Sequence, residues 1–97
     1  MSILILREGQ IQSDKIVDMK SYLTQIVPGT RNYDGCQEIN VYFNRDNPWN
    51  MVVLQQWESR DHFNKYVQWS EEAGAFARSV SMLTSPLSTR YFERADI

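Results

Sequence analysis

The sequence contains one cysteine and one histidine, and this scarcity excludes several kinds of site. The single thiol, Cys36, cannot form an internal disulfide or a multi-cysteine metal centre, and we interpret it as a small core residue. His62 cannot build a transition-metal site alone, although a site shared with neighbouring carboxylates is conceivable. The chain also lacks a glycine-rich phosphate loop, a Ser-His-Asp order and a dinucleotide-binding fingerprint. An enzyme with this sequence would therefore work without a cofactor, or with an external haem or small redox molecule.

Positive charge and long apolar runs are also scarce. Ten basic residues stand against twelve acidic ones, which gives a net charge of −2. A protein that binds nucleic acid through its phosphates is normally basic, so we expect no nucleic-acid partner. The apolar run Ile3–Leu6 has only four residues before Arg7, whereas a spanning helix needs about 20. We therefore expect a cytoplasmic protein without a membrane segment, and a strand buried on both faces at this run.

Aromatic side chains, by contrast, are abundant. The 97 residues include three Trp, five Tyr and four Phe. A hydrophobic fraction of 42% and a charged fraction of 23% are ordinary for a globular protein. The length allows one domain over residues 1–97.

Hydrophobic periodicity predicts four strands and two main helices. We expect strands at 3–11, 36–43, 51–57 and 90–94, and helices at 13–27 and 59–73. Ser13 and Ser59 are the predicted N-caps, and Pro28-Gly29 is expected to end the first helix. Gly74 is expected to break or kink the second helix, with a further short helix around Phe76 and Val80.

The order β-α-β-β-α-β predicts an α+β, ferredoxin-like fold with a four-stranded antiparallel sheet. Two helices can cover only one face of such a sheet. Yet in the strand at 51–57, Met51 and Val53 point one way and Val52 and Leu54 the other, so both faces carry apolar residues. We therefore predict a homodimer in which two sheets pack together.

The aromatic residues from the third strand onwards are candidates for a ligand site. Tyr66 and Trp69 are neighbours on one surface of the second helix. A pocket for a flat hydrophobic ligand could be walled by Trp57, Phe63, Tyr66, Trp69 and Phe76. Polar partners would come from the paired strands, with Asn40, Tyr42, Gln55 and Gln56 as candidates. Plain core packing explains the same aromatic pattern, and both interpretations stay open.

Residues 52–76, VVLQQWESRDHFNKYVQWSEEAGAF, resemble the segment typical of antibiotic biosynthesis monooxygenase (ABM) domains. In those domains a strand that ends in an aromatic residue runs through a Ser/Asp turn into a helix. Trp57, Ser59 and Phe63 match that pattern, and the element order and length agree as well. The resemblance implies a dimeric α+β barrel. It also implies small monooxygenases that oxidise phenols or hydroquinones with O2 and need neither metal nor flavin.

The match departs from the family pattern at four positions. Gln55 stands where an acidic residue is usual, Tyr66 where many members have His, and Trp69 where Ser is common. In the haem-degrading branch, Phe76 stands where the iron-ligating His is expected, and phenylalanine cannot ligate iron. Haem degradation is therefore set aside.

We predict a cofactor-independent monooxygenase acting on a phenol or hydroquinone. Trp57, Trp69 and Phe63 would hold the ring, Tyr66 or His62 would manage the proton, and Asn40 or Gln55 would bind the developing oxyanion. The alternative is a non-enzymatic dimeric barrel that binds a small hydrophobic ligand or acts as an interaction module. A cavity above about 300 Å³ would favour ligand chemistry, and a filled interior would favour the alternative.

Overall fold

The computed structural model describes residues 2–97 as one four-stranded sheet with three helices. The elements, in chain order, are β1 (Ile3–Gln10), α1 (Ile16–Arg31), β2 (Cys36–Phe43), β3 (Asn50–Trp57), α2 (Arg60–Glu72), α3 (Ala75–Val80) and β4 (Ser88–Phe92).

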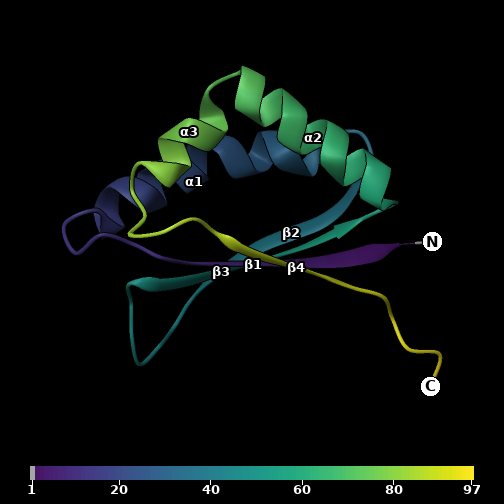
Figure 1. Cartoon of the computed structure of the whole chain (residues 1–97), viewed down its shortest axis with the longest axis horizontal. Coiled ribbons are helices and arrows are strands. Elements are labelled where there is room, and N and C mark those ends of the chain that lie inside the picture. The colour runs from purple at the N-terminus through teal and green to yellow at the C-terminus, as the bar shows by residue number, and fades with distance from the viewer. Residues whose placement is uncertain (1) are drawn as a thin grey trace.

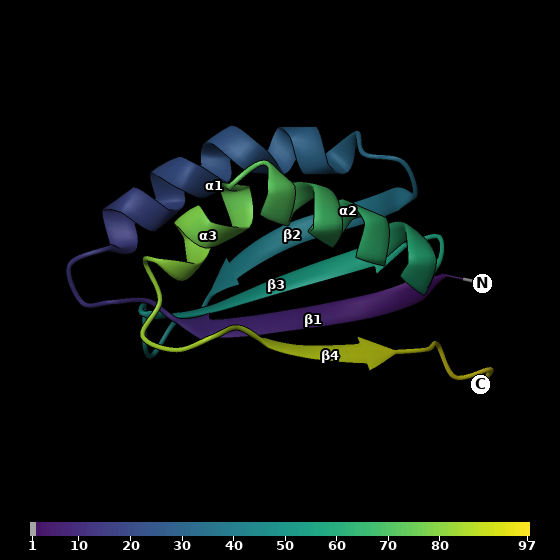
Figure 2. The same cartoon turned by 45° about the horizontal axis from the view of Figure 1, so that its top comes forward.

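The sheet is antiparallel throughout, with the order β2-β3-β1-β4. All three helices lie on one face of it, as Figures 1 and 2 show. The predicted ferredoxin-like α+β fold is therefore confirmed. The two central strands, β1 and β3, run directly beneath the helices, so side chains on their inner face meet α1 and α2 in the interior (Figure 2).

Residues alternate in burial along the central strands because successive side chains point to opposite faces. On β3 the inner-facing Met51, Val53, Gln55 and Trp57 are all buried. The prediction that the first strand is buried on both faces is wrong for the single chain. Ile5 is inaccessible, whereas its neighbour Leu4 on the outer face is 40% exposed, because no helix covers that side.

Helix α1 begins and ends later than predicted. Ser13 does not cap it, because the backbone N–H of Lys15 donates to the carbonyl of Gln12 and closes a turn over residues 12–15. Pro28 lies within the helix, which continues to Arg31. A proline removes one intrahelical hydrogen bond, but here the last turn is held from outside, since buried Thr30 bonds to a residue of α2.

Helix α2 begins as predicted. The Ser59 side chain accepts a hydrogen bond from the backbone N–H of His62, which satisfies a donor of the first turn. Gly74 separates α2 from α3 with a φ of +79°, in the left-handed region where glycine carries no steric penalty. The final strand, β4, lies slightly earlier in the chain than the predicted 90–94.

Candidate functional site

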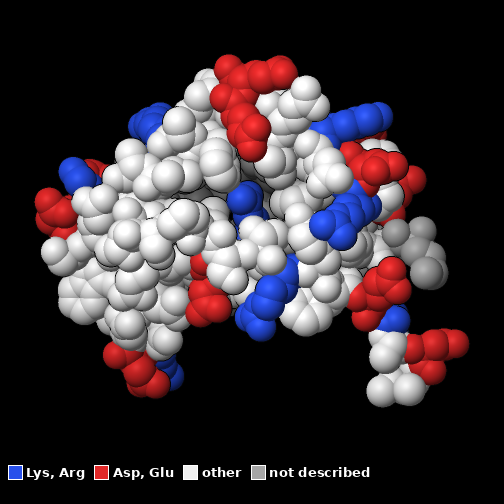
Figure 3. All heavy atoms as spheres, viewed as in Figure 1, with Lys and Arg blue, Asp and Glu red and all other residues white. Residues whose placement is uncertain are grey.

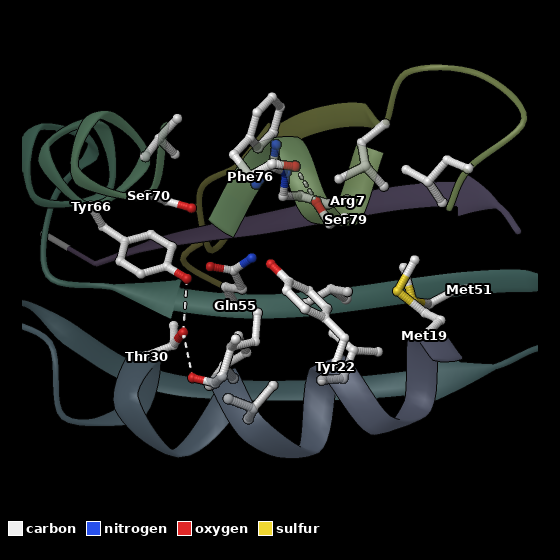
Figure 4. Close-up of a pocket in the computed structure, with 18 residues that line it drawn as sticks. Arg7, Met19, Tyr22, Thr30, Met51, Gln55, Tyr66, Ser70, Phe76 and Ser79 are labelled. Atoms are coloured by element: carbon white, nitrogen blue, oxygen red, sulfur yellow. Dashed lines mark hydrogen bonds between the residues drawn. The ribbon is translucent and has the colours of Figure 1, made fainter. Parts of the chain in front are cut away.

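A cavity of about 70 Å³ lies between the sheet and the helices (Figure 4). Its walls are mainly apolar, and its polar lining comes from seven side chains: Arg7, Tyr22, Thr30, Gln55, Tyr66, Ser70 and Ser79. An apolar hollow with a few convergent polar groups is typical of a ligand site. The volume, however, is below the 300 Å³ expected of a site for a whole small molecule. In this conformation the cavity can hold only part of an aromatic ligand.

Tyr66 comes from α2 and lies with its hydroxyl at the cavity wall. Its oxygen is 2.8 Å from the Thr30 hydroxyl, which in turn donates to the backbone carbonyl of Ile26 at 3.3 Å. Either hydroxyl can be the donor in the Tyr66–Thr30 contact. When Thr30 donates to Ile26, Tyr66 donates to Thr30 and the Tyr66 oxygen is left as an acceptor. Burial raises the pKa of Tyr66 above its ordinary value, so the phenol is neutral at neutral pH.

Gln55 lies at the centre of the cavity floor, on β3. The indole N–H of Trp57 donates to its side-chain oxygen at 2.9 Å. An indole nitrogen can only donate, so this contact fixes which end of the amide is oxygen. The amide nitrogen has no hydrogen-bond partner within residues 2–97. Gln55 therefore offers two N–H donors to an oxygen in the cavity.

Arg7 is the one cation that lines the cavity, and sequence reasoning missed it. It lies on the inner face of β1, paired with Val53 of β3 and so diagonal to Gln55. Desolvation by burial lowers the pKa of its guanidinium, which still remains protonated. The sequence held a signal for it, because Arg7 follows the buried Ile5 by two residues and must share its face.

Helix α3 covers one end of the cavity through Phe76 and Ser79. The hydroxyl of Tyr22 on α1 donates to the carbonyl of Ala75 at 2.6 Å and ties the two helices together. No residue of α3 is fully buried. The residues that follow α3, Met82 and Leu83, are buried and anchor its C-terminal end.

The aromatic candidates divide between the core and the surface. Trp57 and Phe63 are buried at the end of the sheet, with ring centroids 5.9 Å apart. Neither residue lines the cavity. Trp57 is connected to it only by its hydrogen bond to Gln55, which does line it. Trp69 is 49% exposed and packs on Tyr33 outside the cavity. Of the predicted aromatic residues, only Tyr66 and Phe76 contribute to the cavity wall.

Two predicted polar residues lie elsewhere. His62 lies at the start of α2, where its ring packs against Gly35. Its Nδ1 is 2.6 Å from the Ser59 hydroxyl. Its Nε2 faces the carboxylates of Glu58 and Asp34 at 3.7 and 3.9 Å, and His62 does not line the cavity. The sequence showed only its position in the first turn of the helix and not this direction.

Asn40 lies on the outer face of the sheet. Its side-chain amide donates to Glu38 two residues before it, at 3.0 Å. Neighbouring Ile39 is buried and lines the cavity instead. Alternation along β2 therefore turns Asn40 away from the site.

The sequence matches the model of a known protein family. Residues 2–79 match the family model described as antibiotic biosynthesis monooxygenase. The chain belongs to this family. The resemblance inferred from residues 52–76 is thereby confirmed, and membership suggests monooxygenase-like chemistry.

Solved structures share the fold of this ABM domain. A conserved protein from Methanosarcina mazei Go1 superposes with a TM-score of 0.89 at 15% identity, over 98% of this chain and 94% of that one. A protein from Mycobacterium tuberculosis superposes with a TM-score of 0.87 at 18% identity, over 100% of this chain and 98% of that one. A putative antibiotic biosynthesis monooxygenase from Bordetella bronchiseptica gives 0.84 at 14%, over 97% of each chain. No curated protein matches the sequence.

Two further findings concern membranes and metals. None of the helices in residues 2–97 has the length and apolar character needed to cross a bilayer. Within the same residues, no three side chains of the His, Cys, Asp or Glu type are grouped as metal ligands.

Proposed function

We propose that this ABM domain is a cofactor-independent monooxygenase that oxidises a phenol or hydroquinone ring with O2 in the cavity beneath α2 and α3. The proposal is supported by family membership together with one observation. The only polar groups on the cavity floor and wall are donors and acceptors suited to a phenolic oxygen, with Gln55 and Tyr66 foremost. The rest of the lining is apolar and excludes water from reactive intermediates.

The reaction balances without a cofactor because the substrate supplies the electrons. A phenolate transfers one electron to O2, and the resulting phenoxyl radical and superoxide combine to form a C–O bond at a ring carbon. The hydroperoxide then loses the proton of that carbon, and its O–O bond breaks. One phenol and one O2 thus yield one quinone and one water.

Gln55 and Tyr66 take distinct roles in this proposal. The free N–H groups of Gln55 would bind the phenolate oxygen as charge develops on it, held in place by Trp57. Tyr66 would accept the hydrogen bond of the substrate hydroxyl in the arrangement in which it donates its own proton to Thr30. A neutral Tyr66 orients the substrate rather than acting as its base, and His62 is not among the residues that line the cavity.

Entry of a ring requires the cavity to enlarge, and α3 is the element placed to allow this. It follows Gly74, and the space around the Gly74 backbone is open, since a Cβ placed there would meet no atom within 4 Å. Its ties to the rest of the chain include the single hydrogen bond from Tyr22 to Ala75. Outward movement of α3 would carry Phe76 and Ser79 away from the cavity and open it from that end.

We also propose that the working unit is a homodimer. The outer face of the sheet carries apolar and aromatic side chains that no helix covers: Leu4, Leu6, Tyr42, Val52, Leu54 and Phe92. Leu4, Tyr42 and Phe92 are 40%, 51% and 41% exposed. A second sheet packed on this face would remove them from water.

An oxygen-electrode assay tests the proposed reaction. Purified protein would be incubated with phenols, hydroquinones and anthrone-like tricyclic phenols, and heat-denatured protein would correct for spontaneous oxidation. The proposal predicts O2 uptake above that background, proportional to protein concentration, with at least one compound. The small cavity favours one rival, a non-enzymatic binding barrel. That function predicts saturable binding of the same compounds with no added O2 uptake, and this result would overturn the proposal.

A further inference from the structure

Arg7 carries a partly buried positive charge in the cavity wall and forms no salt bridge with residues 2–97. No Asp or Glu oxygen lies within 4.0 Å of its guanidinium among residues 2–97. Its Nε is buried and has no hydrogen-bond partner there. The guanidinium carbon lies 5.8 Å from the ring centre of Phe63 and 5.5 Å from that of Phe76. These two rings offset part of the cost of burying the charge, but they supply no hydrogen-bond acceptor.

A partly buried cation that forms no salt bridge costs folding free energy, so its position calls for a physical reason. A guanidinium cannot shed its proton to avoid the cost. The cavity-lining residues around it are uncharged: Gln55 on the floor, Tyr22 and Tyr66 on the walls and Ser79 at the end. The carboxylate of Glu71 acts on Arg7 only from beyond salt-bridge distance. The place of a direct negative partner is therefore open to a group from outside the chain.

We propose that the Arg7 end of the cavity binds the carboxylate of an aromatic ligand. A carboxylate is ionised at neutral pH, unlike a phenol, and its two oxygens match the planar fork of a guanidinium. Figure 4 shows Arg7 beside Phe76 and Ser79, across the cavity from Thr30, with Gln55 between them. A ring held at Arg7 by its carboxylate would thus extend toward the amide of Gln55.

The dimensions agree with this assignment. A cavity of about 70 Å³ has room for a group of two or three heavy atoms, given about 30 Å³ for one water in the liquid. The acidic group therefore fits the existing space, and only the ring requires Phe76 to move. On the face seen in Figure 3, basic atoms lie recessed near the middle and are framed by uncharged residues, with acidic side chains on the rim above.

The anion site extends the proposed function by naming the substrate class, but binding tests it separately from turnover. Under anaerobic conditions, calorimetry would compare 2,5-dihydroxybenzoate with 2,5-dihydroxybenzamide, its neutral isostere. The two compounds share the hydroquinone ring and differ in the charge of one substituent. We expect the acid to bind about tenfold more tightly or better, as charge-assisted hydrogen bonds contribute.

Three variants locate the effect. Arg7→Met should bind acid and amide equally, and Arg7→Lys should restore part of the preference because it restores the charge. Arg45→Gln removes one positive charge from the exposed turn between β2 and β3 and should keep the full preference. Unfolding temperatures of all variants would confirm that each is folded.

The outcomes separate the two proposals. Equal binding of acid and amide by the unaltered protein, a preference that survives Arg7→Met, or no binding of the acid at millimolar concentration would each overturn the anion site. A clear acid preference without O2 uptake would retain the anion site and remove the oxygenase. O2 uptake with uncharged phenols, without a preference for the acid, would retain the oxygenase and remove the anion site.

Discussion

The indole N–H of Trp57 donates to the side-chain oxygen of Gln55, two residues earlier on the same strand. The two side chains share the inner face of β3, where Trp57 is inaccessible and Gln55 is buried beneath the helices. Trp57 belongs to the core, whereas Gln55 lines the cavity. The contact therefore couples the packing of the aromatic cluster to the orientation of the amide that faces the ligand space.

Gln55→Leu should lower the free energy of unfolding by about 1–3 kcal/mol, because it leaves the buried indole N–H without an acceptor. Gln55→Glu is the matched control, since its carboxylate can still accept from Trp57 and can also pair with Arg7. Urea unfolding followed by tryptophan fluorescence measures both. Equal losses in the two variants would show that the hydrogen bond does not contribute to stability.

Arg7→Met should raise the free energy of unfolding by about 1 kcal/mol, since it replaces a partly buried charge that forms no salt bridge with an apolar chain of similar length. Arg7→Ala should lower it, because the small side chain leaves a void between Phe63 and Phe76. The same urea titrations apply. A loss of more than about 1 kcal/mol in Arg7→Met would mean that the guanidinium has a structural partner and is not held for a ligand.

Tyr66→Phe removes the hydrogen bond to Thr30 and the acceptor in the cavity. The expected cost in stability is about 1 kcal/mol, whereas turnover of a phenol should fall about 10- to 100-fold, as loss of an orienting group does. Thr30→Val tests the same bond from the other side and leaves the Tyr66 hydroxyl in place. It should cost stability but retain more of the activity. Unchanged turnover in Tyr66→Phe would remove Tyr66 from the proposed mechanism.

Stability should fall with rising pH in the alkaline range. Burial raises the pKa of both Tyr22 and Tyr66 in the folded chain. The unfolded chain, with an ordinary tyrosine pKa of about 10, therefore loses these protons first. The stabilising contribution is complete below pH 10 and is lost as pH rises from there through the raised values. Urea unfolding between pH 8 and 11 should show this decline, and Tyr66→Phe should reduce its slope. A pH-independent free energy over that range would contradict it.

Leu54→Glu should dissociate the proposed dimer, because it places a carboxylate at the centre of the uncovered sheet face. Val17→Glu is the control, since Val17 is 79% exposed on α1, away from the sheet. Sedimentation velocity at micromolar concentration should give a dimer for the unaltered protein and for Val17→Glu, and a monomer for Leu54→Glu. A stable monomer in all three would overturn the dimer.

The order of strands and helices was predictable because each element has a clear hydrophobic period and turn signals at its ends. The ends of α1 were not, since local signals at Ser13 and Pro28 are overridden by a turn at Gln12 and by the tertiary bond of Thr30. Local sequence cannot reveal such distant contacts.

The candidate site was only partly predictable. Tyr66, Gln55 and Phe76 were found, because strand alternation and helical spacing place them inward. Those rules cannot say which way a residue near a helix end will turn, and His62 does not line the cavity. Arg7 was missed because its charge suggested the surface, although its place in the alternation of β1 puts it inside.

Labelling with ¹⁸O₂ tests the central claim, that this cavity inserts oxygen into an aromatic ring without a cofactor. The metal-free protein would be supplied with ¹⁸O₂ and with the compound that shows the highest O2 uptake, and the product would be analysed by mass spectrometry. The account predicts one ¹⁸O atom in each quinone formed and one in water, with incorporation reduced in Tyr66→Phe. A product without ¹⁸O, or the same yield from heat-denatured protein, would contradict it.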